Sequence, residues 1–163
     1  MTGMRMRTRR IGIITAAATL GLAVVSSAGT SFRLEVGPPV AAGINYKLKG
    51  ALFVVRALVC DDLATVRITG TAEGMVNGAR QSVPLKLIPV NTPGIYAVEQ
   101  QWPVDGQWVL HLSGSCTSPK ADASTIVPMR KSTFIREKVQ VLIMPATKKQ
   151  IDAALADLVR SES

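Results

Sequence analysis

The chain has 163 residues, 47% of them hydrophobic, and a formal net charge of +8 at pH 7. That length is enough for one domain with a hydrophobic core and too short for two ordinary ones. With one histidine and two cysteines, the composition argues against a zinc site, which needs three or four suitably spaced ligands.

The first 28 residues have the pattern of an export signal. Four arginines and no acidic residue precede an uninterrupted apolar and small-residue run from Ile11 to Val25. This run is shorter than the ~20 residues needed to span a bilayer, and small residues at Ser26 and Ala28 predict cleavage after Ala28. We therefore expect residues 1–28 to be a signal peptide and the protein to be periplasmic or secreted, with an uncleaved anchor as the alternative.

Cleavage would also change the charge balance. Removing the four N-terminal arginines leaves 15 basic against 11 acidic residues, a net charge of about +4. Such a mildly basic exported protein can contact anionic surfaces, but nothing points to nucleic acid. We expect a protein or an envelope component as partner, and membrane contact only if the signal stays uncleaved.

Residues 29–145 alternate between apolar and polar residues and contain many turn signals, which predicts short β-strands in an antiparallel sandwich. Asn77–Gly78 is a strong signal for a tight hairpin, and Pro84 favours an edge position for the return strand that contains it. The expected strands, in chain order, cover residues 31–36, 44–50, 51–60, 64–74, 80–88, 95–102, 107–114, 125–131 and 134–145.

The stretch from Thr92 to Cys116 predicts a hairpin that starts at Pro93–Gly94 and turns at Asp105–Gly106. Alternation places Tyr96, Val98 and Trp102 on one face of the first strand. It likewise places Trp108, Leu110 and Leu112 on one face of the second. We expect both tryptophans in the core, and the opposite face, which holds His111, in solvent.

Two cysteines in an exported chain favour one disulfide, between Cys60 and Cys116. In the chain-entropy model, a bridge over such a long loop contributes on the order of 4 kcal/mol.

Residues 146–163 change to a helical period. Thr147 and Gln150 are spaced as a capping box, and apolar residues from Ile151 to Val159 form one stripe. We expect a short amphipathic helix that docks on its own sandwich. Binding to a partner or a membrane surface is the alternative.

The residues that could carry chemistry are few. Ser113 lies two positions from His111 on the same strand face, but no acid is in register to complete a triad. We therefore expect no enzymatic activity and no cofactor. A copper-handling protein that uses His111 with Met129 and Met144 is the alternative, because exported copper sites favour histidine and methionine.

Between Leu52 and Gly114 the sequence resembles the YtkA-like and FixH-like exported domains. The resemblance rests on Pro93, Gly94 and Tyr96 before an alternating strand, and on Gly106 followed closely by Trp108. It implies an immunoglobulin-like sandwich outside the cytoplasmic membrane, and FixH-like members are linked to assembly of membrane oxidases. We expect an exported, non-enzymatic binding or accessory module of the cell envelope.

Overall fold

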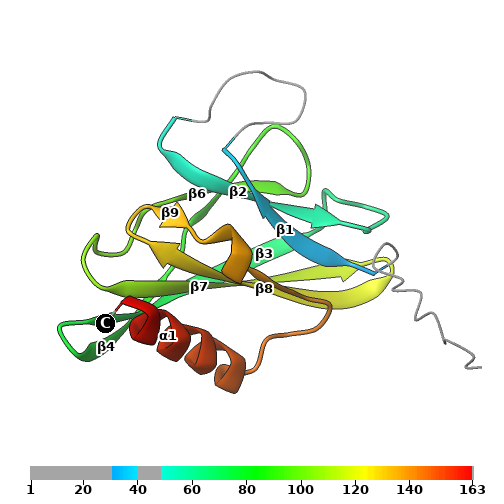
Figure 1. The fold of residues 1–163 in the computed structure, drawn as a ribbon. Helices are drawn as coiled ribbons and strands as arrows, with labels where there is room; N and C mark the ends of the chain where they lie inside the picture. The colour runs from blue at the N-terminus through cyan, green and yellow to red at the C-terminus, as the bar shows by residue number, and fades with distance from the viewer. Residues whose placement is uncertain (1–30, 40–48, 163) are drawn as a thin grey trace, which may run out of the picture.

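Two antiparallel β-sheets pack face to face, and one helix lies outside them (Figure 1). The computed structural model describes residues 31–39 and 49–162. The predicted signal peptide and most of the strand expected at 44–50 lie outside the described residues. Within those residues, no helical segment has the length and apolarity that a membrane crossing requires.

The first sheet has four strands. Its spatial order is β1 (Arg33–Gly37), β2 (Ala51–Leu58), β6 (Ile95–Glu99) and β5 (Leu87–Pro89).

The second sheet has six strands, and a short 3-10 helix (Arg136–Lys138) lies between its last two. Its order is β10 (Gln140–Leu142), β8 (Lys120–Arg130), β7 (Gln107–Thr117), β3 (Arg67–Val76) and β4 (Ala79–Pro84), with β9 (Thr133–Phe134) paired to β8.

These orders are those of an immunoglobulin-like sandwich. In that fold the strand sequence A-B-E-D forms one sheet, and C, F and G form the other. Here β1-β2-β6-β5 takes the first arrangement, and β8-β7-β3 takes the second. The predicted fold class, an all-β sandwich with a C-terminal helix, is therefore confirmed. β9, β10 and the helix extend the basic pattern.

The core lies between the two sheets. The strand β7 illustrates how alternation builds it, because Trp108, Leu110 and Leu112 point inward and are at most 2% exposed. They meet Phe53 and Val55 from β2, which are fully buried. Burying each such side chain contributes roughly 1.5–3 kcal/mol.

The hairpin predicted around Trp102 and Trp108 is wrong. β6 pairs with β2 and β5, whereas β7 pairs with β3 and β8, so the two strands belong to opposite sheets. Their apolar faces meet across the core instead of lying side by side. Alternation shows which face of a strand is buried, but it does not show which strand is its neighbour.

The strand expected at 80–88 is also wrong in part, because it is two strands in different sheets. β4 ends at Pro84, at the edge of the six-stranded sheet, and β5 begins at Leu87, at the edge of the other. Pro84 cannot donate a ladder hydrogen bond, which suits this edge position. The Lys86 backbone N–H donates instead to Gln101 Oε1, 2.7 Å away.

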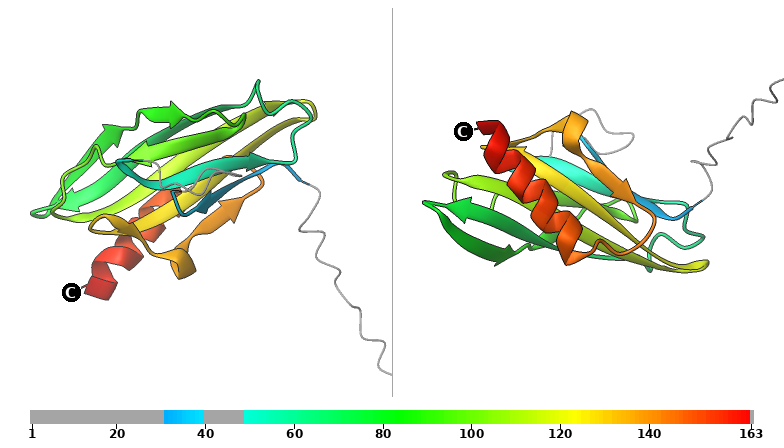
Figure 2. Two further views of the ribbon diagram at one scale, coloured as in Figure 1. Left: turned by 90° about the horizontal axis from the view of Figure 1, so that it is seen from above. Right: turned by 60° about the horizontal axis from the view of Figure 1, so that its bottom comes forward.

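The helix α1 (Lys148–Glu162) packs on the outer face of the six-stranded sheet, and the right view of Figure 2 shows it in front of that sheet. Leu155 and Leu158 are at most 4% exposed, and they pack with Val109 and Ile126 of β7 and β8. The apolar stripe of the helix is therefore used within the domain. This contact also explains why Val109, on the face expected to be in solvent, is fully buried.

Gly74 tests the packing of the core at Trp108. The two residues are directly opposite in β3 and β7, and a Cβ at Gly74 would overlap the indole ring. We expect Gly74→Ala to lower the free energy of unfolding by roughly 1–3 kcal/mol. An extra methyl group in a filled core forces side chains and backbone to shift, which costs free energy of this size. Urea unfolding of the purified variant measures this effect.

Gly37→Ala is the matched control. A Cβ there would meet open space, so we expect a change within about 0.5 kcal/mol. Equal effects of the two substitutions would contradict the tight packing of Trp108 on Gly74.

Candidate functional site

Cys60 and Cys116 form the predicted disulfide, across 56 residues of chain. Cys60 follows β2 and Cys116 lies near the end of β7, so the bond joins the two sheets. Both cysteines of the sequence are consumed in this bond. A thiol is therefore not present for redox chemistry or metal binding while the disulfide is intact.

The aromatic residues between Thr92 and Cys116 are packing residues. Trp102 and Trp108 are 3% and 2% exposed. The Trp108 Nε1–H donates to the carbonyl oxygen of Asp105, 2.9 Å away, which ties the ring to the Asp105–Gly106 turn. The Tyr96 hydroxyl donates to the carbonyl oxygen of Val66 at 2.9 Å, linking the two sheets. Neither tryptophan ring offers an open platform for a ligand.

His111 belongs to a chain of polar contacts on the outer face of the six-stranded sheet. Its Nε2 lies 3.0 Å from Ser113 Oγ, and Ser113 Oγ lies 3.2 Å from Ser124 Oγ. Ser124 Oγ accepts a hydrogen bond from the Ala146 backbone N–H at 3.0 Å. We call this set, from His111 to Ala146, the hydroxyl relay.

The imidazole of His111 is half-buried, not fully in solvent as expected. Desolvation lowers the pKa of His111 below its ordinary value, and the charge of Glu73 opposes this shift only in part. A neutral ring can accept at Nε2 from the Ser113 hydroxyl. At the other end of the relay the Ala146 N–H donates to Ser124 Oγ, and between these ends each hydroxyl is able to donate or accept.

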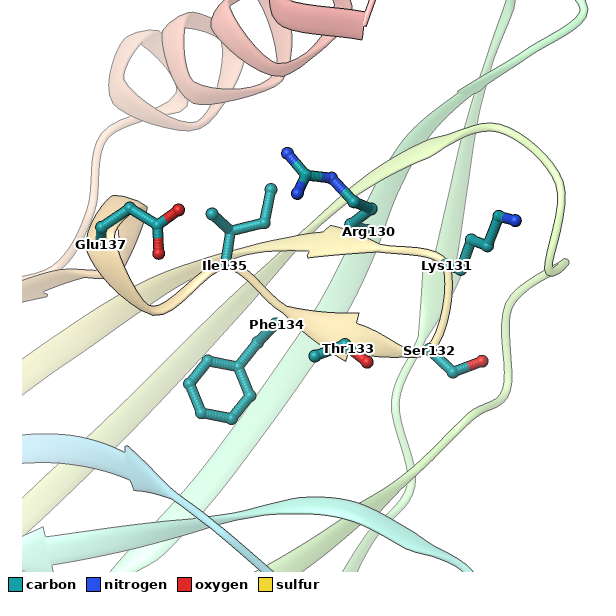
Figure 3. Close-up of a pocket in the computed structure, with 7 residues that line it drawn as sticks. All are labelled: Arg130, Lys131, Ser132, Thr133, Phe134, Ile135 and Glu137. Atoms are coloured by element: carbon teal, nitrogen blue, oxygen red, sulfur yellow. The ribbon is translucent and has the colours of Figure 1, made fainter.

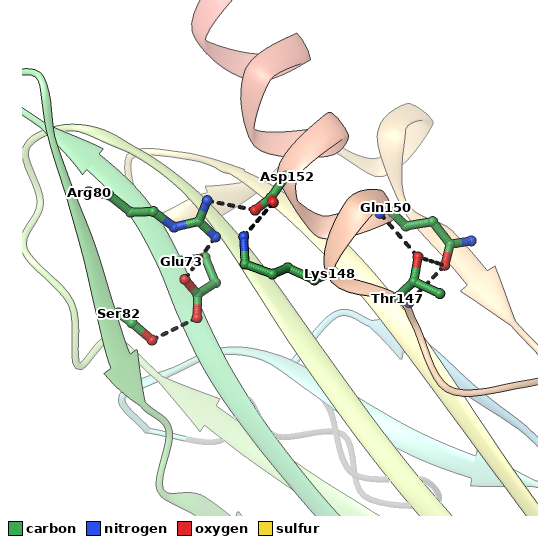
Figure 4. A network of polar contacts seen from close by, with 7 residues as sticks. All are labelled: Glu73, Arg80, Ser82, Thr147, Lys148, Gln150 and Asp152. Atoms are coloured by element: carbon green, nitrogen blue, oxygen red, sulfur yellow. Dashed lines mark hydrogen bonds and ion pairs between the residues drawn. The ribbon is translucent and has the colours of Figure 1, made fainter.

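The relay lacks the acid of a catalytic triad. Glu73 is the acidic side chain that acts on His111, but its carboxylate is already engaged (Figure 4). It accepts from Ser82 Oγ at 2.6 Å and pairs with Arg80 at 3.2 Å. A general base needs a partner that orients it and stabilises its charged form. The arrangement positions the Ser113 hydroxyl between His111 and Ser124.

The same glutamate belongs to a network that holds α1 against the sheet (Figure 4). Arg80 bridges Glu73 on β3 and Asp152 on α1, with 2.6 Å between Arg80 Nη1 and Asp152 Oδ1. Hydrogen bonds from Lys148, and next from Arg80, hold the pKa of Asp152 below its ordinary value. The predicted capping box is present, since Thr147 N donates to Gln150 Oε1 at 2.9 Å.

The copper ligands considered from the sequence are not brought together. Met129 lies opposite Trp108 on the inner face of the sheet and is 2% exposed, whereas His111 lies on the outer face. Met144 follows β10 and is 59% exposed. In the described part of the chain, no three His, Cys, Asp or Glu side chains gather in a way that could hold a metal ion.

An open groove of about 600 Å³ lies at the turn between β8 and β9 (Figure 3). Arg130 and Lys131 lie on one side of it and Glu137 on another, so its charges are mixed. The Ser132 hydroxyl donates to Gln100 Oε1 at 2.7 Å, which fixes the turn to the chain after β6. The groove is exposed and shows no geometry for chemistry.

An exposed apolar segment begins in the edge strand β10 and continues after its end at Leu142. Val141, Ile143 and Met144 are 42%, 60% and 59% exposed. We call these three residues the apolar edge. β10 pairs with β8 on one side and is the last strand of its sheet among the described residues.

Two features of the site escaped sequence reasoning, namely the partner of Ser113 and the exposure of the apolar edge. Ser124 lies opposite Ser113 because β7 and β8 turn at Ser118–Pro119. The two serines are equally distant in sequence from that turn. A prediction of a hairpin at Ser118–Pro119 would therefore have placed them opposite each other. The segment 141–144 was expected to alternate within a strand, but β10 ends at Leu142.

No protein family, curated protein or solved structure matches this chain.

His111 provides a clean pH test, because it is the only histidine in the sequence. Its pKa in the folded chain lies below the ordinary 6.5. The unfolded chain therefore binds the proton more tightly, and stability falls as pH drops from 6.5 through the folded pKa. We expect the single imidazole NMR signal to titrate below 6.5.

We also expect His111→Gln to lose less stability than the wild type between about pH 7.5 and pH 5. Urea unfolding at both pH values measures this difference. An imidazole that titrates above its ordinary value would show that His111 is not desolvated as described.

Proposed function

We propose that this protein is an exported, non-enzymatic binding or accessory module of the cell envelope, whose partner is a protein or an envelope component. The disulfide between Cys60 and Cys116 fits an oxidising compartment. The N-terminal pattern of residues 1–28 supports export. The resemblance to YtkA-like and FixH-like domains supports the accessory role.

The apolar edge is the observation that carries the binding role. Single exposed apolar residues are common on protein surfaces, but adjacent ones mark interaction sites. Val141, Ile143 and Met144 lie within four consecutive positions, Val141 in the edge strand β10 and the other two directly after it. Natural edge strands are usually protected by charge or proline, because an open edge can pair with another chain. Here the short strand β10 is followed by apolar residues up to Pro145.

The helix α1 is the alternative surface for binding a partner. It is less suitable because its apolar residues already pack within the domain. Its apolar residues are buried against β7 and β8. Its polar side is tied to the β3–β4 hairpin by Arg80 and to the 3-10 helix by Lys138, which lies 2.9 Å from Asp157 Oδ2. Releasing it would expose Val109 and Ile126. A partner is therefore bound more readily at the apolar edge than by the helix.

A photo-crosslinking amino acid in place of Ile143 tests this proposal in the intact envelope of the host. We expect a defined cross-linked product at Ile143, because partners at an exposed apolar edge come within contact distance. Mass spectrometry identifies the product. Val104, which is 58% exposed in the β6–β7 connection, is the matched control position. A product at Val104 but none at Ile143 would move the interaction away from the apolar edge.

Export is tested separately by the intact mass of the protein recovered from its host. We expect a mass that lacks residues 1–28 and is two hydrogens below the dithiol form, since the signal is removed and the disulfide is formed. Treatment with reductant should restore the two hydrogens. A chain that keeps its first 28 residues would instead be a tethered accessory protein.

A further inference from the structure

The helix α1 covers one part of the outer face of the six-stranded sheet, and the part that it leaves uncovered is polar. A trough of about 190 Å³ lies there, and its lining combines side chains of β3, β7 and β8 with one residue that follows β10. Its lining includes Arg67, Thr69, Ser113, Ser115, Asp122 and Pro145. We call this feature the polar trough.

The strand register places two opposite charges at its sides. Arg67 lies opposite Ser115, and Ser115 lies opposite Asp122, so the three residues form one row across β3, β7 and β8. Two strand spacings separate the Cα atoms of Arg67 and Asp122, which is about 10 Å. The guanidinium and the carboxylate thus flank a central hydroxyl.

These two charges differ from most of the other charged groups in their contacts. Within the described residues, neither the Arg67 nor the Asp122 side chain forms a hydrogen bond or an ion pair, whereas Arg33, Arg80 and Lys138 all do. Both side chains are exposed. The Arg67 guanidinium lies on one side of the trough and the Asp122 carboxylate on the other. Together they suit a ligand that carries both a negative and a positive charge.

The floor of the polar trough is held in place by the hydroxyl relay. Ser113 lies in the next row of the sheet, between Thr69 and Ser124. Its oxygen contacts His111 Nε2 and Ser124 Oγ, and Ser124 is fully buried and bonded to the Ala146 N–H. A hydroxyl with fixed partners is oriented before a ligand arrives, which reduces the entropy lost on binding.

We propose that the polar trough binds a compact zwitterion of the α-amino acid class. The ligand carboxylate pairs with the Arg67 guanidinium, and its ammonium group pairs with the Asp122 carboxylate. The Ser115 hydroxyl lies between them. Charge-assisted hydrogen bonds of this kind are about twice as strong as neutral ones. A simple anion is repelled by Asp122, and a simple cation is repelled by Arg67, so both charges are needed.

This inference is independent of the proposed partner at the apolar edge, because it uses a different surface and a different ligand. Titration of the protein, as exported by its host, with L-alanine at neutral pH tests it. Amide NMR shifts report binding residue by residue. Acetate and methylammonium, at matched ionic strength, carry each charge alone.

We expect saturable shifts at Ser113, Ser115 and Asp122 with L-alanine, and at least tenfold weaker binding of acetate or methylammonium. Arg67→Gln and Asp122→Asn should each weaken L-alanine binding at least tenfold. Both residues are exposed, so the fold should be kept, and unchanged shifts in the core check this. Lys149→Gln and Asp105→Asn, which change exposed charges elsewhere, should leave binding unchanged.

Three outcomes would overturn the proposal. One is no saturable shift at L-alanine concentrations on the order of 100 mM, far above a dissociation constant on the order of 1 mM. Another is equal binding of acetate, which would make the trough a simple anion site. The third is L-alanine binding that survives both Arg67→Gln and Asp122→Asn.

Discussion

The docking of α1 on the outer face of the six-stranded sheet is the contact that organises this protein. It buries Val109 and Ile126 on a face that strand alternation alone assigns to solvent. Removing the helix would expose these side chains and separate the Arg80–Asp152 pair. Because the ion pairs are exposed, they contribute little free energy, and the apolar contact supplies most of the attachment. The network in Figure 4 mainly fixes where the helix lies.

The same contact divides the sheet into two regions with different chemistry. Under the helix the face is apolar, while beyond it lie the hydroxyl relay and the polar trough. The chain that enters the helix carries the Ala146 N–H, which anchors Ser124. The helix therefore orders polar groups that it does not cover. The apolar residues of the helix are buried against the sheet. The apolar edge, Val141, Ile143 and Met144, precedes the helix in the sequence and stays exposed.

Much of the fold could be predicted from the sequence, because the signals were local. The alternation around Leu110 and Leu112 identified their buried face, Asn77–Gly78 marked a turn with positive φ at both residues, and a capping box marked the start of α1. Pairing between strands was harder. Trp102 and Trp108 share a core, but their strands lie in opposite sheets. The polar trough was out of reach, since Arg67, Ser115 and Asp122 become neighbours only through the register of three strands.

The hydroxyl relay holds Ser113 on the outer face of the six-stranded sheet. The Ala146 N–H donates to Ser124 Oγ, which lies 3.2 Å from Ser113 Oγ, and Ser113 Oγ lies 3.0 Å from His111 Nε2. Activating Ser113 as a nucleophile requires His111 to become charged, and burial opposes that charge. Glu73 could stabilise it, but Arg80 and Ser82 already hold its carboxylate. The contacts with His111 and Ser124 thus hold the Ser113 side chain in one position in the lining of the polar trough.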